Sequence, residues 1–196
     1  MVLTPSTMLQ LGTVAPDFKL KDVSSQKEFT LGSFTGKKAL LVEFICRHCP
    51  YVQHIRVELA KLGRDYLNKD VAIVAISAND AAKYPDDAPV SLAAFASEEG
   101  FNFPFLFDPT QETAKAYTAA CTPDFFLFDK DRGLVYRGQL DDSRPGNGKP
   151  VTGLDLRAAL DAVLAGKSLP ALQRPSIGCN IKWKPGNEPR YFASKS

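Results

Sequence analysis

Apolar residues in the first half of the chain follow the pattern of a β-α-β unit. Residues 38–45 form a nearly continuous apolar run, which is typical of a central strand covered on both faces. After Pro50, apolar side chains recur at steps of three and four residues, as on one face of a helix. These side chains are Val52, Ile55, Leu59, Leu62 and Tyr66. A second apolar run at residues 71–77 predicts a right-handed crossover that makes the two strands parallel.

Two helices are expected after this unit. Residues 79–90 contain prolines and several acidic residues and predict a loop. Residues 91–99, followed by a glycine, have the pattern of a short helix with a glycine just past its end. Asp108 and Gln111 have the spacing of an N-cap and its capping-box partner. We therefore expect a helix that begins there and runs to about residue 120.

A hairpin and a last helix complete the predicted order. Residues 124–129 and 134–140 flank a short turn and predict two antiparallel strands. Residues 154–165, followed by Gly166, predict the final helix. The order β-α-β, intervening helices and then β-β-α predicts an α/β fold with a central mixed β-sheet flanked by helices.

The chain is expected to form one domain with an extension at each end. Residues 12–168 contain all the predicted elements, and residues 1–11 form an N-terminal extension. Residues 169–196 are rich in proline and irregular, so we expect a C-terminal tail packed on the domain. Trp183, the only tryptophan, is expected to anchor this tail by burial.

Composition excludes several classes of partner. The chain has 24 Lys and Arg against 22 Asp and Glu, and these charges are scattered, which argues against nucleic acid binding. No run approaches the roughly 18 apolar residues of a membrane span, so no membrane partner is expected. The first twelve residues lack the pattern of a secretory signal, and we expect a cytoplasmic protein.

Two of the four cysteines lie in the segment Cys46-Arg47-His48-Cys49-Pro50, at the predicted junction of strand and helix. Thiol–disulfide exchange needs a thiolate that attacks and a second thiol that releases the mixed disulfide. We expect the helix dipole to lower the pKa of Cys46, which attacks, while Cys49 one turn inside the helix resolves. Arg47 and His48 between them are expected to stabilise the thiolate further and to make the disulfide more oxidising.

Two other interpretations of the cysteine pair stay open at this point. The pair could be half of a zinc site, but such a site needs a second cluster, and Cys121 and Cys179 are far apart in the sequence. The cysteines could also be inert and buried. The position at a strand-to-helix junction favours a redox pair, with no metal and no organic cofactor.

The chain resembles the thioredoxin-like superfamily, in its alkyl hydroperoxide reductase/thiol-specific antioxidant (AhpC/TSA, peroxiredoxin-like) branch. The resemblance spans about residues 12–168 and is carried by residues 15–18, 40–50, 121–129 and 135–138. It implies that Thr122-Pro123 is a cis-proline turn opposite the cysteines, and that Pro123 shapes the surface that receives the substrate. Thr122 and Pro50 would contact that substrate. Cys121 would lie near the pair as a possible additional thiol, and a resolving role for Cys179 is an alternative.

The chain also departs from the patterns of its relatives. Thioredoxins have a tryptophan directly before the first cysteine and an acid six residues before it, where this chain has Ile45 and Leu40. Glu43 is the nearest acid, which leaves the general base open. When the peroxidase motif Pro-x-x-x-Thr/Ser-x-x-Cys is aligned on Cys49, this chain has Val42 in place of the proline and a cysteine in place of the threonine or serine. The peroxide-binding motif is therefore absent.

The sequence predicts a thiol–disulfide oxidoreductase with an antioxidant or redox-homeostasis role. Its partners would be a protein or small-molecule disulfide and an unidentified reducing partner. One alternative is a thiol-dependent peroxidase that reduces hydroperoxides through a sulfenic acid. The second is a non-catalytic redox sensor that controls binding through residues 79–90 or through the tail.

Overall fold

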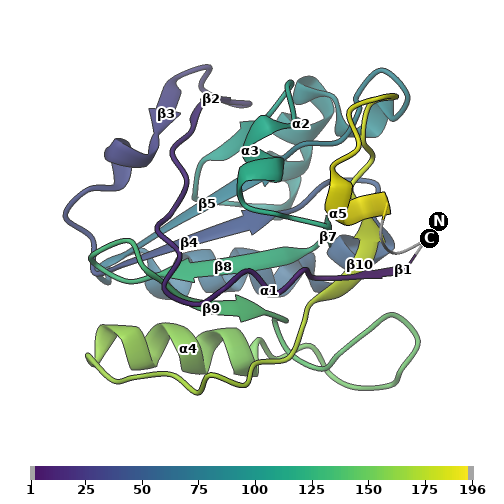
Figure 1. Ribbon diagram of the computed structural model, residues 1–196. Helices are drawn as coiled ribbons and strands as arrows, with labels where there is room; N and C mark the ends of the chain where they lie inside the picture. The colour runs from purple at the N-terminus through teal and green to yellow at the C-terminus, as the bar shows by residue number, and fades with distance from the viewer. Residues whose placement is uncertain (1–2, 194–196) are drawn as a thin grey trace.

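The computed structural model describes residues 3–193, so the ends of the predicted extension and tail lie outside the described residues. Its main feature is a seven-stranded sheet in the order β3-β2-β6-β5-β4-β8-β9 (Figure 1). The strands are β2 (Lys19–Asp22), β3 (Glu28–Thr30), β4 (Ala39–Phe44), β5 (Val71–Ser77), β6 (Phe105–Phe107), β8 (Asp124–Phe128) and β9 (Leu134–Gly138). Strands β4, β5 and β6 are parallel and the other pairs are antiparallel, so the predicted mixed sheet is confirmed.

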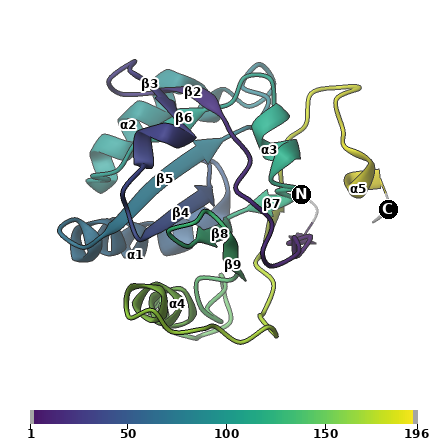
Figure 2. The ribbon, with the colours of Figure 1, turned by 60° about the vertical axis from the view of Figure 1, so that its left-hand side comes forward.

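Helices cover both faces of the sheet. They are α1 (Pro50–Tyr66), α2 (Pro89–Glu99), α3 (Glu112–Ala116) and α4 (Leu154–Leu164), with short 3-10 turns at Leu31–Phe34 and Pro85–Asp87. One apolar core lies between the sheet and α1, α2 and α4, and a second core lies on the face that carries α3 (Figure 2). No helix among residues 3–193 is both long and apolar enough to span a bilayer.

The central strands form where the apolar runs predicted them. Every residue of β4 and of β5 is buried, and the two strands pair in parallel from Ala39 opposite Val71 to Phe44 opposite Ile76. Along β4 the side chains alternate between the two cores, as the two-residue period of a strand requires. All five apolar positions that predicted one helical face are buried in α1. The β-α-β unit is therefore confirmed.

The helix expected from Asp108 to about residue 120 is wrong in length. The Asp108 carboxylate does accept the backbone N–H groups of Gln111 and Ala114, at 2.9 and 3.1 Å. Gln111, however, has a left-handed backbone (φ 66°), and its side chain donates to the carbonyl oxygens of Ala78 and Lys182 instead of closing a capping box. These tertiary contacts leave only the five-residue α3.

The segment after residue 168 returns to the domain through a second, three-stranded sheet. Its order is β1-β10-β7, with β1 at Leu3–Pro5, β7 at Cys121–Thr122 and β10 at Ile177–Asn180. Beyond it, Trp183 is buried as expected and lies edge-on to Tyr191 of α5 (Arg190–Ala193). The sequence did not predict β10, which lies between β1 and β7 (Figure 1).

Candidate active site

The cysteine pair lies in the loop between β4 and α1. Helix α1 begins at Pro50, and Cys49 is its N-cap, with an extended backbone (φ −73°, ψ 121°). A proline at the first helical position loses no helical hydrogen bond, so it sets the start of the helix here. The expected placement, with Cys46 at the helix N-terminus and Cys49 one turn inside, is wrong. The positive end of the helix dipole lies at Cys49.

Thr122 contacts both thiols. Its hydroxyl lies 3.4 Å from Cys46 Sγ, and its carbonyl oxygen lies 3.1 Å from Cys49 Sγ. The Thr122–Pro123 peptide bond is cis, as the resemblance implies. Strand β7 therefore brings this turn against the two cysteines, although 73 residues separate Thr122 from Cys49.

A third thiol completes the group. Cys179 of β10 lies with its Sγ 2.9 Å from Cys49 Sγ, and all three cysteines are buried. Cys121, which the resemblance offers as an additional thiol, is also buried, and its Sγ lies 3.5 Å from the Pro123 carbonyl oxygen. The structure thus places Cys179 in contact with the pair.

The order of acidity is the reverse of the expected one. Burial raises the pKa of Cys46 well above its ordinary value, and the thiol of Cys49 and the charge of Asp87 raise it further. Hydrogen bonds from Cys179 and Cys46 lower the pKa of Cys49, and Thr122 and the Val52 backbone N–H on the first turn of α1 add to this effect. The hydrogen bonds around Cys49 and the helix N-terminus therefore make it the more acidic thiol of the pair.

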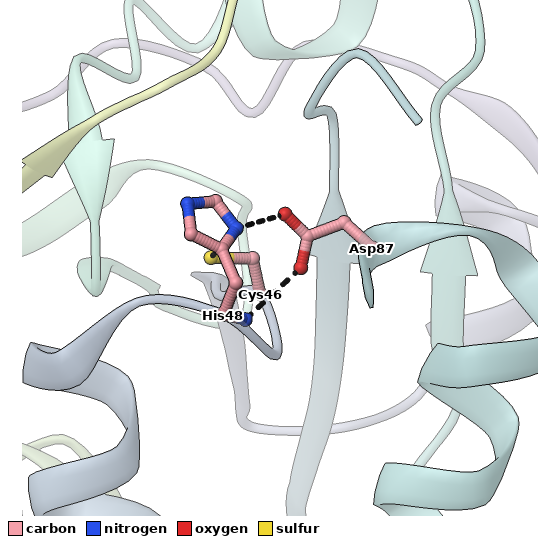
Figure 3. Close-up of side chains that lie close together, drawn as sticks. All are labelled: Cys46, His48 and Asp87. Atoms are coloured by element: carbon pink, nitrogen blue, oxygen red, sulfur yellow. Dashed lines mark hydrogen bonds and ion pairs between the residues drawn. The ribbon is translucent and has the colours of Figure 1, made fainter. Parts of the chain in front are cut away.

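Asp87 orders the loop that carries Cys46. One of its carboxylate oxygens accepts the backbone N–H groups of Arg47 and His48, at 2.8 and 3.2 Å. The other oxygen contacts His48 Nδ1 and accepts from Asn79, as a buried carboxylate requires. Figure 3 shows Asp87 bridging the backbone and the ring of His48, with Cys46 beside the ring.

The His48 ring is held in one orientation beside the first cysteine. Its Nδ1 lies 3.9 Å from Cys46 Sγ, and the ring stacks on Tyr84 with centroids 5.2 Å apart. Cys46, His48 and Asp87 offer three donor atoms that could hold a metal ion. In this arrangement Nδ1 already contacts the carboxylate directly.

Arg47 and Pro50 take positions at the edge of the site. The Arg47 guanidinium donates to the Ser91 carbonyl oxygen at 2.9 Å and pairs with Glu98 at 3.1 Å, both on α2. These contacts tie the cysteine loop to that helix. Pro50 is exposed at the start of α1, whereas Thr122 and Pro123 are buried.

Glu43 is the one buried acid of β4. It lies two residues from Leu41 and from Ile45, so it faces the core beneath α1 that also contains both cysteines. Neither carboxylate oxygen has a hydrogen-bond partner among the described residues. Burial without a partner raises the pKa of Glu43 to about 8.

Comparison with known proteins identifies the family. The Redoxin family model matches residues 10–154. The chain belongs to the Redoxin family. A thiol–disulfide oxidoreductase domain from Bacteroides vulgatus, at 19% identity, has a TM-score of 0.61, covering 80% of this chain and 99% of its own. The thioredoxin-like fold predicted from the sequence is therefore confirmed.

Several relatives of this Redoxin protein carry descriptive names. Thiol-disulfide oxidoreductase ResA of Geobacillus kaustophilus is 27% identical over 65% of this chain and 68% of its own length. Alkyl hydroperoxide reductase E of Mycobacterium tuberculosis is 31% identical over 71% of this chain and 82% of its own length. An uncharacterized conserved protein from Geobacillus kaustophilus has a solved structure with a TM-score of 0.93, at 53% identity, covering 95% of this chain and 98% of that one.

Asp87 is a residue of the candidate site that the sequence analysis did not single out. Its only signal was the acidic character of residues 79–90, which contain several carboxylates, and 39 residues separate it from His48. The general base, which the sequence left open, has two candidates: the His48–Asp87 pair beside Cys46, and Glu43, which faces the core that also contains both cysteines.

Proposed function

We propose that this Redoxin protein is a thiol–disulfide oxidoreductase whose redox pair is Cys46 and Cys49. The observation that carries the proposal is the contact of both sulfur atoms with Thr122, the residue directly before the cis-proline. One of these sulfur atoms belongs to Cys49, the N-cap of α1. In this arrangement one thiol can form a mixed disulfide with a substrate, and the two thiols can then form a disulfide with each other. The substrate would be a protein or small-molecule disulfide, and a separate reducing partner would supply the electrons.

The lowered pKa of Cys49 sets the order of the steps. The Cys49 thiolate attacks one sulfur of the substrate disulfide, the substrate S–S bond breaks, and its other sulfur leaves as a thiolate. Cys46 then attacks Cys49 Sγ, which forms the Cys46–Cys49 disulfide and releases the second substrate thiolate. Cys46 must lose its proton for this attack, and the His48 ring together with its Asp87 carboxylate, whose atoms lie within 4.8 Å of Cys46 Sγ, is the neighbouring group that can take it. Asp87 holds that ring in place.

Reduction of insulin disulfides in the presence of dithiothreitol tests the proposal. We expect the wild-type protein to accelerate the reaction and Cys49→Ser to abolish the acceleration. A Cys46→Ser/Cys179→Ser variant keeps only the attacking thiol of the group, and it should accumulate a mixed disulfide on Cys49. Accumulation of that adduct in Cys49→Ser, on Cys46, would contradict the order of attack.

Hydroperoxide reduction is the second candidate. The similarity to alkyl hydroperoxide reductase E favours it, as does a thiolate at the N-cap of α1. A peroxidase would convert Cys49 to a sulfenic acid and then to a disulfide. Consumption of hydrogen peroxide, with dimedone trapping of the Cys49 sulfenic acid in Cys46→Ser/Cys179→Ser, tests it. Inactivity in both assays would favour a redox sensor. The cytoplasmic location stays a prediction.

A further inference from the structure

The chain's own C-terminal strand occupies the surface beside the cis-proline. Strand β10 pairs antiparallel with β7, and the register places Cys179 opposite Thr122. Ser176 donates its hydroxyl to the Pro123 carbonyl oxygen at 2.6 Å, which extends the contact past the proline. Figure 1 shows β10 running along β7. The tail thus covers Thr122 and Pro123, the turn that the resemblance implies is part of the substrate surface.

Gly178 permits this close approach. A Cβ atom at this position would lie 2.0 Å from the Thr122 carbonyl oxygen, a distance that no side chain tolerates. The neighbouring Cys179 thereby reaches Cys49, with 2.9 Å between the sulfur atoms. A disulfide bond is about 2.05 Å long, so the two sulfur atoms need to approach by only about 0.9 Å to form one.

We propose that Cys179 is a third redox-active thiol, which exchanges with Cys49 inside the same chain. The proposal rests on the proposed function, because it starts from the Cys46–Cys49 disulfide. Cys179 attacks Cys49 Sγ, the Cys49–Cys179 bond forms, and the Cys46–Cys49 bond breaks. Cys46 leaves as a thiolate and takes up the proton that Cys179 has lost. The chain stays oxidised by two electrons throughout, so the step needs no further oxidant.

Cys49 lies between two thiols that belong to different parts of the fold. Cys46 lies in the loop before α1 and Cys179 lies in β10, so Cys49 can bond to only one of them at a time. The Cys49–Cys179 bond would join β10 to α1 across the cis-proline and would return Cys46 as a free thiol. In this state the tail closes the substrate surface until a reductant cleaves the bond.

The Cys46→Ser variant isolates this bond. Its Cys49 thiolate should attack glutathione disulfide and release one glutathione, and Cys179 should then displace the second glutathione from Cys49. Trypsin places the four cysteines in four peptides, residues 39–47, 48–56, 116–130 and 168–182. After alkylation of free thiols, mass spectrometry should find 48–56 linked to 168–182, with one free thiol per chain.

Three further variants complete the test. Cys46→Ser/Cys121→Ser should keep the link, and Cys46→Ser/Cys179→Ser should lose it and retain glutathione on Cys49. Cys46→Ala replaces Cys46→Ser if circular dichroism shows that the serine variant does not fold. A folded Cys46→Ser or Cys46→Ala variant in which Cys49 carries only glutathione or an interchain disulfide would overturn the proposal. Failure of the proposed function looks different, because the wild-type protein would then form no link between 39–47 and 48–56.

Discussion

Replacement of Glu43 by glutamine tests whether a carboxyl group is buried without a partner beneath α1. Glu43 is fully buried, and neither oxygen has a hydrogen-bond partner among the described residues. Burial raises its pKa from 4.5 to about 8. Each pH unit between the unfolded and folded pKa is worth about 1.4 kcal/mol. Ionisation of Glu43 should therefore cost the folded protein about 5 kcal/mol.

The sign of the effect follows from proton binding. Between pH 4.5 and about 8 the folded protein holds the Glu43 proton while the unfolded chain has lost it. Stability from this group is thus complete below pH 4.5 and is lost as the pH rises through the folded pKa of about 8. Glu43→Gln removes the titration and nearly preserves the side-chain volume. The variant should match the wild type at about pH 4 and exceed it in stability by several kcal/mol at about pH 9.

Urea unfolding followed by circular dichroism across this pH range measures the difference, with a phosphine reductant keeping all cysteines reduced. The difference between variant and wild type cancels the groups that titrate in both proteins. Glu28→Gln is the matched control, because its carboxyl is half-exposed and pairs with Lys19 at the surface. A Glu43→Gln difference that stays constant with pH would refute the reasoning, since it would mean that the carboxylate is solvated or paired in the folded protein.

Three further variants probe the loop and the tail. His48→Ala exposes Cys46 to the Asp87 charge, so ultraviolet titration should show a higher pKa of the Cys46 thiol; an unchanged pKa would contradict this. Asp87→Asn removes a charge that raises the pKa of Cys46, so ultraviolet titration should show a lower pKa for the Cys46 thiol. A higher pKa for this thiol would contradict the prediction. Gly178→Ala should lower the free energy of unfolding, measured in urea, by about 1–3 kcal/mol. The control Gly32→Ala should lower it by less, because the added Cβ meets only a hydroxyl at 3.4 Å. Equal losses of stability in the two variants would show that β10 can shift.

Local sequence patterns predicted the elements that depend on burial alone. The apolar run of β4 and the helical period of α1 each record which side chains face the core, and both elements formed as predicted. The sequence also contained the signal for the start of α1, because proline is a residue type that begins helices and Pro50 is the first residue of this one. The expectation placed the helix N-terminus three residues too early, at Cys46, and so assigned the lowered pKa to the wrong thiol.

Elements and residues set by distant contacts could not be predicted in this way. Gln111 has the spacing of a capping residue, but Ala78 and Lys182 bind its side chain, and α3 is short as a result. Asp87 reaches His48 across 39 residues through a 3-10 turn that no periodic pattern marks. Each of these contacts joins segments that only the folded chain brings together.

The tail carries the most distant of these contacts and the one with the greatest consequence for the chemistry. Cys179 touches Cys49 across 130 residues, through a two-residue pairing between β10 and β7 that is too short to leave a pattern in the sequence. The Redoxin match ends at residue 154, before this strand begins, so membership of the family carries no information about a third thiol. The contact exists because Gly178 lets β10 lie against Thr122. Any account of the redox centre of this protein must therefore include residues that a conventional thioredoxin-like domain boundary would leave out.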